Sequence, residues 1–170
     1  MATTSHPAVA QAGALIVSLA TCYGAAALGA RFTAASVDTW YRGLAKPRGT
    51  PPPRVFGAVW TTLYTLMGLA GWLLWQESAR PSRRPAPRVA LGLFALQLTL
   101  NVAWSAVFFG LRRPGTSLGV IAALWLALAA TAATAYRLSR AAAALLAPTL
   151  AWVTYAAYLN WGFYQRNRAT

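Results

Sequence analysis

The stretch that decides the fold is VALGLFALQLTLNVAWSAVFFGL, residues 89–111, which carries no charged side chain. About 20 apolar residues are enough for a helix to cross the roughly 30 Å hydrocarbon layer of a bilayer. One face of such a helix would carry two amides and two aromatic rings within an arc of about 60°: Gln97, Asn101, Trp104 and Phe108. Because unpaired amides are costly in hydrocarbon, this face is predicted to point inward, toward other helices or a ligand.

Four further stretches of the 170-residue chain are uncharged and of similar length, and all 17 charged residues fall outside the five. The predicted spans are 8–30, 55–76, 89–111, 114–136 and 141–165. Membrane β-strands would be about 10 residues long with alternating polarity, a pattern that the sequence lacks. The sequence therefore predicts an all-α membrane protein, a five-transmembrane-helix bundle forming a single integral membrane domain over residues 1–170.

The formal net charge is +13, from 15 basic and two acidic residues. In a membrane protein we expect these cations in loops at the lipid headgroups, and the chain offers no basic soluble domain for nucleic acid. Nine basic residues fall on the side of the C-terminus and six on the other, so the positive-inside rule favours a cytoplasmic C-terminus. The alanine- and arginine-rich composition looks bacterial, which places the protein in a bacterial cell membrane.

Enzymatic chemistry has little support in the sequence. The two carboxylates, Asp38 and Glu77, fall on opposite sides of the predicted membrane, and the chain has one His and one Cys. No acid/base pair, nucleophile–base set or metal-ligand cluster can be assembled from them. We therefore expect no catalytic residue, no metal and no required cofactor, and we expect Asp38 to pair with a loop Arg or Lys.

Two other predicted helices repeat the aromatic face of residues 89–111. Within 55–76, an arc of about 80° carries Phe56, Trp60, Tyr64 and Met67. Within 141–165, one face carries Trp152, Ala156, Leu159 and Phe163. For any one stripe the alternative is plain helix packing, with interhelical amide bonds of about 1 kcal/mol. Three stripes together favour a shared aromatic cavity, in which rings stack on a flat ligand and amides orient it.

The predicted connection over residues 31–54 is the longest in the chain and combines aromatic residues with prolines. Prolines fix φ and exclude regular helix, so the segment is stiffened. Two interpretations stay open, a lid over the helix ends and an aromatic anchor at headgroup level.

An ordered set of motifs covers most of the chain. The first part holds Asp38-x-Trp40-Tyr41, Lys46-Pro47, Pro51-Pro52, Val55-Phe56, Trp60-Thr61 and Leu63-Tyr64. The third span adds Gln97-Leu98, Asn101, Trp104 and Phe108-Phe109-Gly110, and the fifth adds Pro148, Leu150, Trp152, Ala156, Leu159-Asn160 and Asn167. Together these motifs resemble the translocator protein family, also called the tryptophan-rich sensory protein (TspO) or peripheral benzodiazepine receptor family.

The resemblance implies a five-helix bundle that commonly forms a homodimer. It implies a cavity for porphyrins, notably protoporphyrin IX, and for isoquinoline or benzodiazepine drugs, with cholesterol as a further ligand of animal members. The candidate ligand contacts are Trp40, Trp60, Tyr64, Gln97, Asn101, Trp104, Trp152, Ala156 and Leu159. The candidate lid residues are Lys46, Pro47, Pro51 and Pro52, and a possible sterol motif is formed by Leu159, Tyr164 and Arg166.

The chain departs from the family pattern at Arg48 and Gly49, where many members have aromatic residues, and at Thr116, where animal members have Trp. The leading hypothesis is a non-catalytic membrane receptor or carrier for protoporphyrin IX, linked to tetrapyrrole transport or stress regulation. One alternative is light-dependent porphyrin degradation, with Trp60 and Trp152 in a photochemical role. Another is a sterol-binding protein or regulatory scaffold.

Overall fold

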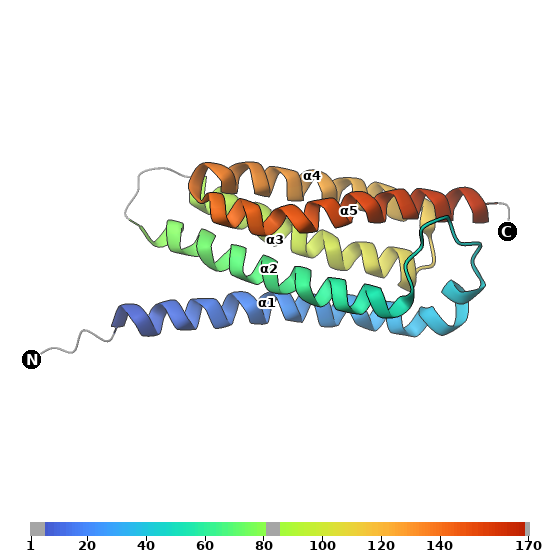
Figure 1. Ribbon diagram of the computed structural model, residues 1–170, viewed down its shortest axis with the longest axis horizontal. Helices are drawn as coiled ribbons and strands as arrows, with labels where there is room; N and C mark the ends of the chain where they lie inside the picture. Colours follow the sequence, from blue (N-terminus) through green and yellow to red (C-terminus); the bar gives the residue numbers. More distant parts are fainter. Residues whose placement is uncertain (1–5, 81–85, 169–170) are drawn as a thin grey trace, which may run out of the picture.

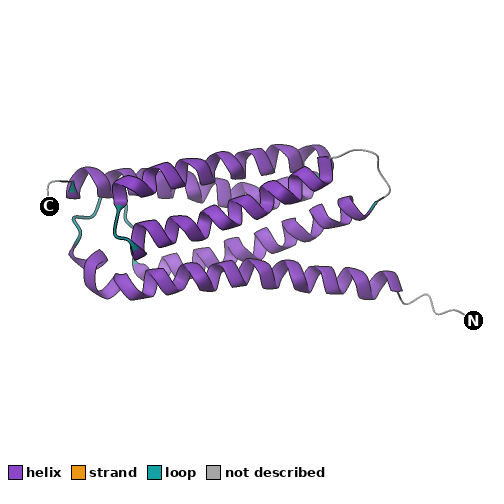
Figure 2. Ribbon diagram, turned by 180° about the vertical axis from the view of Figure 1, so that it is seen from behind, coloured by secondary structure: helices purple, strands orange, loops and turns teal. Residues whose placement is uncertain are grey.

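The computed structural model describes residues 6–80 and 86–168, and these form a bundle of long helices without a strand (Figure 1 and Figure 2). The helices are α1 (His6–Ser36), continued by the π-helical turn η1 (Val37–Tyr41), α2 (Pro53–Ala79), α3 (Ala86–Ser105), continued by the π-helical turn η2 (Ala106–Gly110), α4 (Pro114–Leu138) and α5 (Arg140–Asn167). Five of them are long and apolar enough to cross a bilayer, which confirms the predicted all-α membrane class.

The five helices close into a ring in the order α1, α2, α5, α4, α3. Figure 1 shows that α1 begins at the opposite end of the bundle from the one where α5 ends, as an odd number of spans requires. The helix α1 is the most peripheral, since only 11% of its most apolar window is buried, against 33–39% for the other four. Much of α1 is therefore a lipid-facing surface, and its inner face is a thin wall of the bundle.

The connection between α1 and α2 is shorter than the predicted 31–54. The helix continues through η1 to Gly43, so the irregular segment runs only from Leu44 to Pro52. The prediction was wrong because Arg31 marks the end of the uncharged stretch and not the end of the helix. A helix can carry charges once it leaves the hydrocarbon, and no proline stands between Arg31 and Pro47.

The remaining predicted spans match the observed helices to within a few residues. The helices α2 and α4 begin at Pro53 and Pro114, because proline at the first helical position loses no hydrogen bond and already has helical φ. The start of α5 is capped by the Ser139 hydroxyl, which accepts a hydrogen bond of 3.3 Å from the Ala142 amide.

The two π-helical turns meet at the end of the bundle where α5 ends. The rings of Tyr41 in η1 and Phe109 in η2 lie 5.5 Å apart, and the Ser36 hydroxyl donates a 2.6 Å hydrogen bond to the Phe109 carbonyl. The last carbonyls of a helix have no partner within it, so this bond satisfies one of them. Wider π-helical turns are frequent at functional sites, and both turns border the cavity described next.

Candidate ligand-binding site

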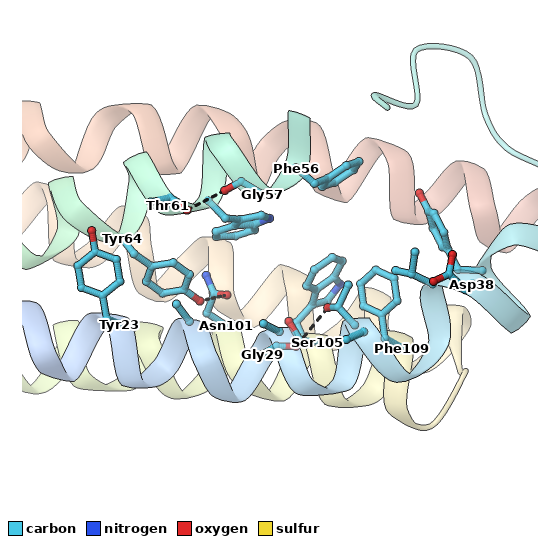
Figure 3. A pocket seen from close by; sticks show the side chains of 18 residues that line it. Tyr23, Gly29, Asp38, Phe56, Gly57, Thr61, Tyr64, Asn101, Ser105 and Phe109 are labelled. Atoms are coloured by element: carbon cyan, nitrogen blue, oxygen red, sulfur yellow. Dashed lines mark hydrogen bonds between the residues drawn. The ribbon is translucent and has the colours of Figure 1, made fainter. Parts of the chain in front are cut away.

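A cavity of about 510 Å³ lies between α1, α2 and α3, in the part of the bundle that contains η1 and η2 (Figure 3). Ligand pockets usually measure about 300–1,000 Å³, so this space suits a drug-sized molecule. The wall from α2 is formed by Phe56, Gly57, Trp60, Thr61 and Tyr64. The wall from α3 and η2 is formed by Asn101, Trp104, Ser105 and Phe109. The third wall comes from α1 and η1.

Indole and phenol rings from two helices border this space. On α2, the rings of Trp60 and Tyr64 lie 5.6 Å apart and are tilted by 35°. On the opposite wall, Trp104 stacks on Phe108 at 5.5 Å and meets the edge of Phe109 at 6.0 Å. Aromatic pairs in such arrangements contribute about 0.5–1.5 kcal/mol beyond their buried area, so a flat ligand has ring partners on two sides.

One atom of a polar side chain in the wall lacks a hydrogen-bond partner. The Tyr64 hydroxyl donates a 3.0 Å hydrogen bond to Oδ1 of Asn101, as the dashed line in Figure 3 shows. The Nδ2 atom of the same amide is buried and has no hydrogen-bond partner in the described part of the chain. Leaving such a donor unpaired costs about 1–3 kcal/mol, so an acceptor atom on a bound ligand would be stabilised here once the amide turns its buried Nδ2 toward the cavity.

The Trp104 indole is fixed from behind by Asn160. Its Nε1 donates to Asn160 Oδ1 at 2.9 Å, and the Ser117 hydroxyl donates to the same oxygen at 2.9 Å. The Nδ2 of Asn160 then donates to the Pro114 carbonyl at 2.8 Å. This network joins α3, α4 and α5, so Asn160 holds the indole of the cavity wall without lining the cavity itself.

The wall from α1 was missed by the reasoning from sequence. It consists mostly of small side chains that recur every three or four positions, namely Ala26, Ala30, Thr33, Ala34 and Val37, with Tyr23 and Tyr41 toward its ends. Such a stripe is a visible helical periodicity, but small residues also mark ordinary helix contacts. One contact is of that kind, because a Cβ on Gly29 would lie 3.3 Å from the Ser105 hydroxyl of α3.

The cavity opens between α1 and α2. Several residues of its wall are exposed on that side, including Ala30, Gly57 and Thr61. The phenol of Tyr23 is 42% exposed and shares a 2.7 Å hydrogen bond with the Thr65 hydroxyl of α2. The opening therefore faces the surface that lipid covers, and one polar contact bridges the two helices at its margin.

Four of the nine predicted ligand contacts line the cavity: Trp60, Tyr64, Asn101 and Trp104. The amide of Gln97 lies one turn away, fully buried, and donates to the Met67 sulfur at 3.6 Å. The ring of Trp40 packs on Phe108 at 5.7 Å, outside the wall.

The predicted contacts on α5 lie behind the cavity. Ala156 and Leu159 are buried in the core, at 6% and 4% exposure. The ring of Trp152 meets Phe56 edge-on at 5.8 Å, and Phe56 is the residue that reaches the wall. The helix α5 thus supports the wall from α2 rather than forming one.

The segment 44–52 packs along α5 and not over the cavity. The Asn167 amide exchanges two hydrogen bonds with the backbone of Ala45, at 3.0 and 3.1 Å, and the Tyr155 hydroxyl donates to the Gly49 carbonyl. Pro47 is buried against Gly162. A Cβ added to Gly162 would come within 2.6 Å of the Cβ of Pro47. None of the candidate lid residues lines the cavity: Lys46, Pro47, Pro51 and Pro52.

Gly49 explains one departure from the family pattern. Its φ of +85° is a conformation that glycine adopts readily and that an aromatic residue would adopt at a cost.

The residues of the possible sterol motif do not form one exposed patch. Leu159 is buried, the ring of Tyr164 packs against Gly115 of α4, and Arg166 is exposed. A lipid-borne sterol on the outer surface would therefore not reach all three side chains.

One charged residue borders the cavity, at the end formed by η1. Asp38 pairs with Arg42 at 2.7 Å, which confirms the expected pairing with a basic residue. The Lys46 ammonium lies 5.7 Å above the ring of Tyr41, another residue of the wall. In the described ranges, no group of three His, Cys, Asp or Glu side chains is placed to hold a metal ion.

Known proteins resemble this chain over most of its length. A model of the TspO/MBR family matches residues 17–166. The human translocator protein is 40% identical over 140 residues, 82% of each chain. The tryptophan-rich protein TspO of Archaeoglobus fulgidus is 38% identical over 153 residues, which is 90% of this chain and 96% of its own. The tryptophan-rich sensory protein of Cereibacter sphaeroides is 39% identical over 142 residues, 84% of each chain. This multi-pass integral membrane protein therefore belongs to the TspO/MBR family.

Proposed function

We propose that this protein is a membrane receptor or carrier that binds a porphyrin, with protoporphyrin IX as the first candidate, in the cavity between α1, α2 and α3. The observation that carries the proposal is the pairing of Trp60 and Trp104 across one cavity, beside the unpaired Nδ2 of Asn101. The rings offer stacking partners to a flat macrocycle, and the amide offers a donor to one polar atom.

Charge at one end of the cavity supports an anionic substituent on the ligand. Near η1, the carboxylate of Asp38 is neutralised by Arg42, and the ammonium of Lys46 lies over Tyr41. Arg42 and Lys46 lie outside the cavity wall, but with Asp38 they give this end of the bundle two cations and one carboxylate, so a propionate that reaches past Tyr41 would meet a net positive charge. A porphyrin would then lie with its propionates toward η1 and its apolar edge toward Tyr64.

The opening between α1 and α2 supports access from the bilayer. The porphyrin macrocycle is apolar and partitions into lipid, and the exposed residues at the opening include Ala30, Gly57 and Thr61. Because these side chains are small, a ligand can pass between the helices without the removal of a large side chain.

Titration of the purified protein with protoporphyrin IX, followed by quenching of tryptophan fluorescence, tests the proposal. Saturable quenching at micromolar porphyrin or below is expected, and Trp104→Phe should reduce its amplitude because one quenched indole is removed. Quenching that rises linearly with porphyrin, as for a dye dissolved in detergent, would contradict it.

Light-dependent porphyrin breakdown is the second candidate function, favoured by the indole of Trp60 in the cavity wall. Trp152, the other residue considered for this role, is separated from the cavity by Phe56. Under illumination of the complex, porphyrin absorption should then decay faster than in protein-free detergent, and Trp60→Phe should slow the decay more than Trp152→Phe.

The orientation and the assembly state are also proposals. We expect the end of the bundle with the segment 44–52 to face the cytoplasm, and the chain to form a homodimer in a bacterial cell membrane. Cysteine labelling from either side of sealed vesicles tests the first, and mass measurement in detergent tests the second.

A further inference from the structure

A second concave site lies on the opposite face of α1 from the cavity. It is a groove of about 440 Å³ between the last turns of α1 and the turn that leads from η2 to α4. Its residues on α1 are spaced by three or four positions, so they form one helical face. This groove takes no part in the proposed porphyrin site.

The groove is apolar along its length and open to the surface. Leu28 and Phe32 line it and are 52% and 37% exposed. The ring of Phe32 lies directly on Gly110. A Cβ added to Gly110 would come within 3.0 Å of Cδ1 of Phe32. The close approach of α1 and η2 at this glycine forms the floor. Exposed apolar side chains on a membrane helix face acyl chains, so this part of the groove lies at the level of hydrocarbon.

Two arginines stand at the groove, and neither of the two acidic side chains of the chain neutralises them. Arg31 ends the uncharged part of α1, and Arg112 follows η2. The sequence has two acidic residues, and both are engaged elsewhere, Asp38 with Arg42 and Glu77 with Arg80. Arg31 and Arg112 therefore have no acidic partner in the described ranges, and the groove is electropositive and suits an anion from outside the chain.

The backbone of Arg112 supports a specific role for its side chain. Its φ is +56°, the one left-handed conformation of a non-glycine residue in the described ranges. Glycine or asparagine takes this conformation more easily than arginine does. The left-handed residue also ends the helix, since the Arg113 amide donates to the Val107 carbonyl at 3.1 Å, and this turn leaves the Arg112 side chain at the groove.

We propose that this groove binds one anionic phospholipid. The headgroup phosphate is held between the guanidinium groups of Arg31 and Arg112, and an acyl chain lies along Leu28 and Phe32. Guanidinium groups bind phosphate through paired hydrogen bonds, and the groove supplies the apolar surface that a free phosphate would leave empty. The occupant therefore needs a charged head joined to a hydrocarbon chain.

Native mass spectrometry of the delipidated protein in detergent tests the proposal. Phosphatidylglycerol and phosphatidylcholine with identical chains are titrated separately. The first phosphatidylglycerol should bind about 30-fold more tightly than the first phosphatidylcholine, because each of two arginines near a membrane surface contributes a factor of about five. The variant R31Q/R112Q should lose this preference. The control variant R137Q/R140Q removes two exposed arginines at the other end of the bundle and should keep it.

Two further measurements separate a built groove from surface charge. Ala35→Trp fills the apolar part of the groove and leaves both arginines in place, so it should also abolish the preference for phosphatidylglycerol. Glycerol phosphate, a headgroup without chains, should not compete. Retention of the preference in R31Q/R112Q or in Ala35→Trp would overturn the proposal. Displacement of phosphatidylglycerol by glycerol phosphate would also overturn it, because it would indicate a site for a free anion.

Discussion

Gly57 offers a direct test of whether the ligand occupies the cavity between α1, α2 and α3. It lines the cavity, and a Cβ built on it has no neighbouring atom within 4 Å. A leucine at this position therefore extends into the cavity without displacing the protein. Leucine also favours a helix by up to about 1 kcal/mol relative to glycine, so the variant Gly57→Leu should fold normally.

The expected loss of affinity follows from the ring contacts. If the leucine keeps a porphyrin from both Trp60 and Trp104, two aromatic contacts of about 0.5–1.5 kcal/mol each are lost. The sum of about 1–3 kcal/mol corresponds to an increase of about 5- to 150-fold in Kd. Tryptophan quenching by protoporphyrin IX measures this directly, because both indoles remain in the variant.

The matched control is Gly119→Leu. Gly119 is an exposed glycine of α4, also with no atom within 4 Å of a built Cβ, and it does not line the cavity. The same substitution there should leave Kd unchanged. A Gly57→Leu protein that melts like the control and binds porphyrin with the Kd of the unsubstituted chain would refute the assignment of this cavity.

Three further substitutions test the surroundings of the cavity. Asn160→Ala leaves the Trp104 N–H buried without its acceptor. The free energy of unfolding, measured in a denaturant titration, should therefore fall by about 1–3 kcal/mol. An unchanged midpoint would show that the network does not stabilise the fold. Asn101→Leu removes the unpaired Nδ2 donor and should raise the Kd for porphyrin about fivefold, or roughly 1 kcal/mol, in the quenching assay; an unchanged Kd would mean that the ligand makes no polar contact there. Gly162→Val forces Pro47 away from α5, so trypsin should cleave after Arg48 sooner than in the unsubstituted chain. The porphyrin Kd should stay within about twofold. A large loss of affinity would show that the segment 44–52 covers the ligand.

The helices could be predicted from the sequence because the bilayer imposes one length and one polarity on every span. Charge marked the limits of the hydrocarbon crossing, and α4 begins at Pro114, the start predicted for that span. The end of α1 could not be found in this way. The helix runs on past Arg31 to Gly43, since its continuation depends on tertiary contacts such as the rings of Tyr41 and Phe109.

The candidate site could be predicted only on the helices where large side chains repeat. Trp60, Tyr64, Asn101 and Trp104 share a cavity as the stripes indicated. The similar stripe on α5 has a different role, because Ala156 is buried in the core. Periodicity identifies an inward face but not what fills the space in front of it. The wall from α1 was missed for the converse reason, since small side chains leave a space and carry no signal of their own.

The hydrogen bonds of α1 explain how a cavity can exist in so small a bundle. Toward one end, the Ser18 hydroxyl donates to the Gly68 carbonyl at 2.7 Å, and Tyr23 bonds to Thr65 at 2.7 Å. Toward the other, Ser36 bonds to the Phe109 carbonyl at 2.6 Å. The stretch between Tyr23 and Ser36 is about 20 Å of helix, and the cavity lies along it.

Along that stretch, no side-chain hydrogen bond joins the described residues of α1 to another helix, and the residues facing α2 are small. The wall is therefore held by hydrogen bonds at both ends, and between them it packs on α3 at Gly29 but makes no hydrogen bond to α2. Separation of α1 from α2 at the opening breaks few favourable contacts, whereas a ligand between them adds contacts to both. Ligand binding should accordingly stabilise α1 against the bundle, and the helix with the least buried surface is the one that ligand exchange requires to move.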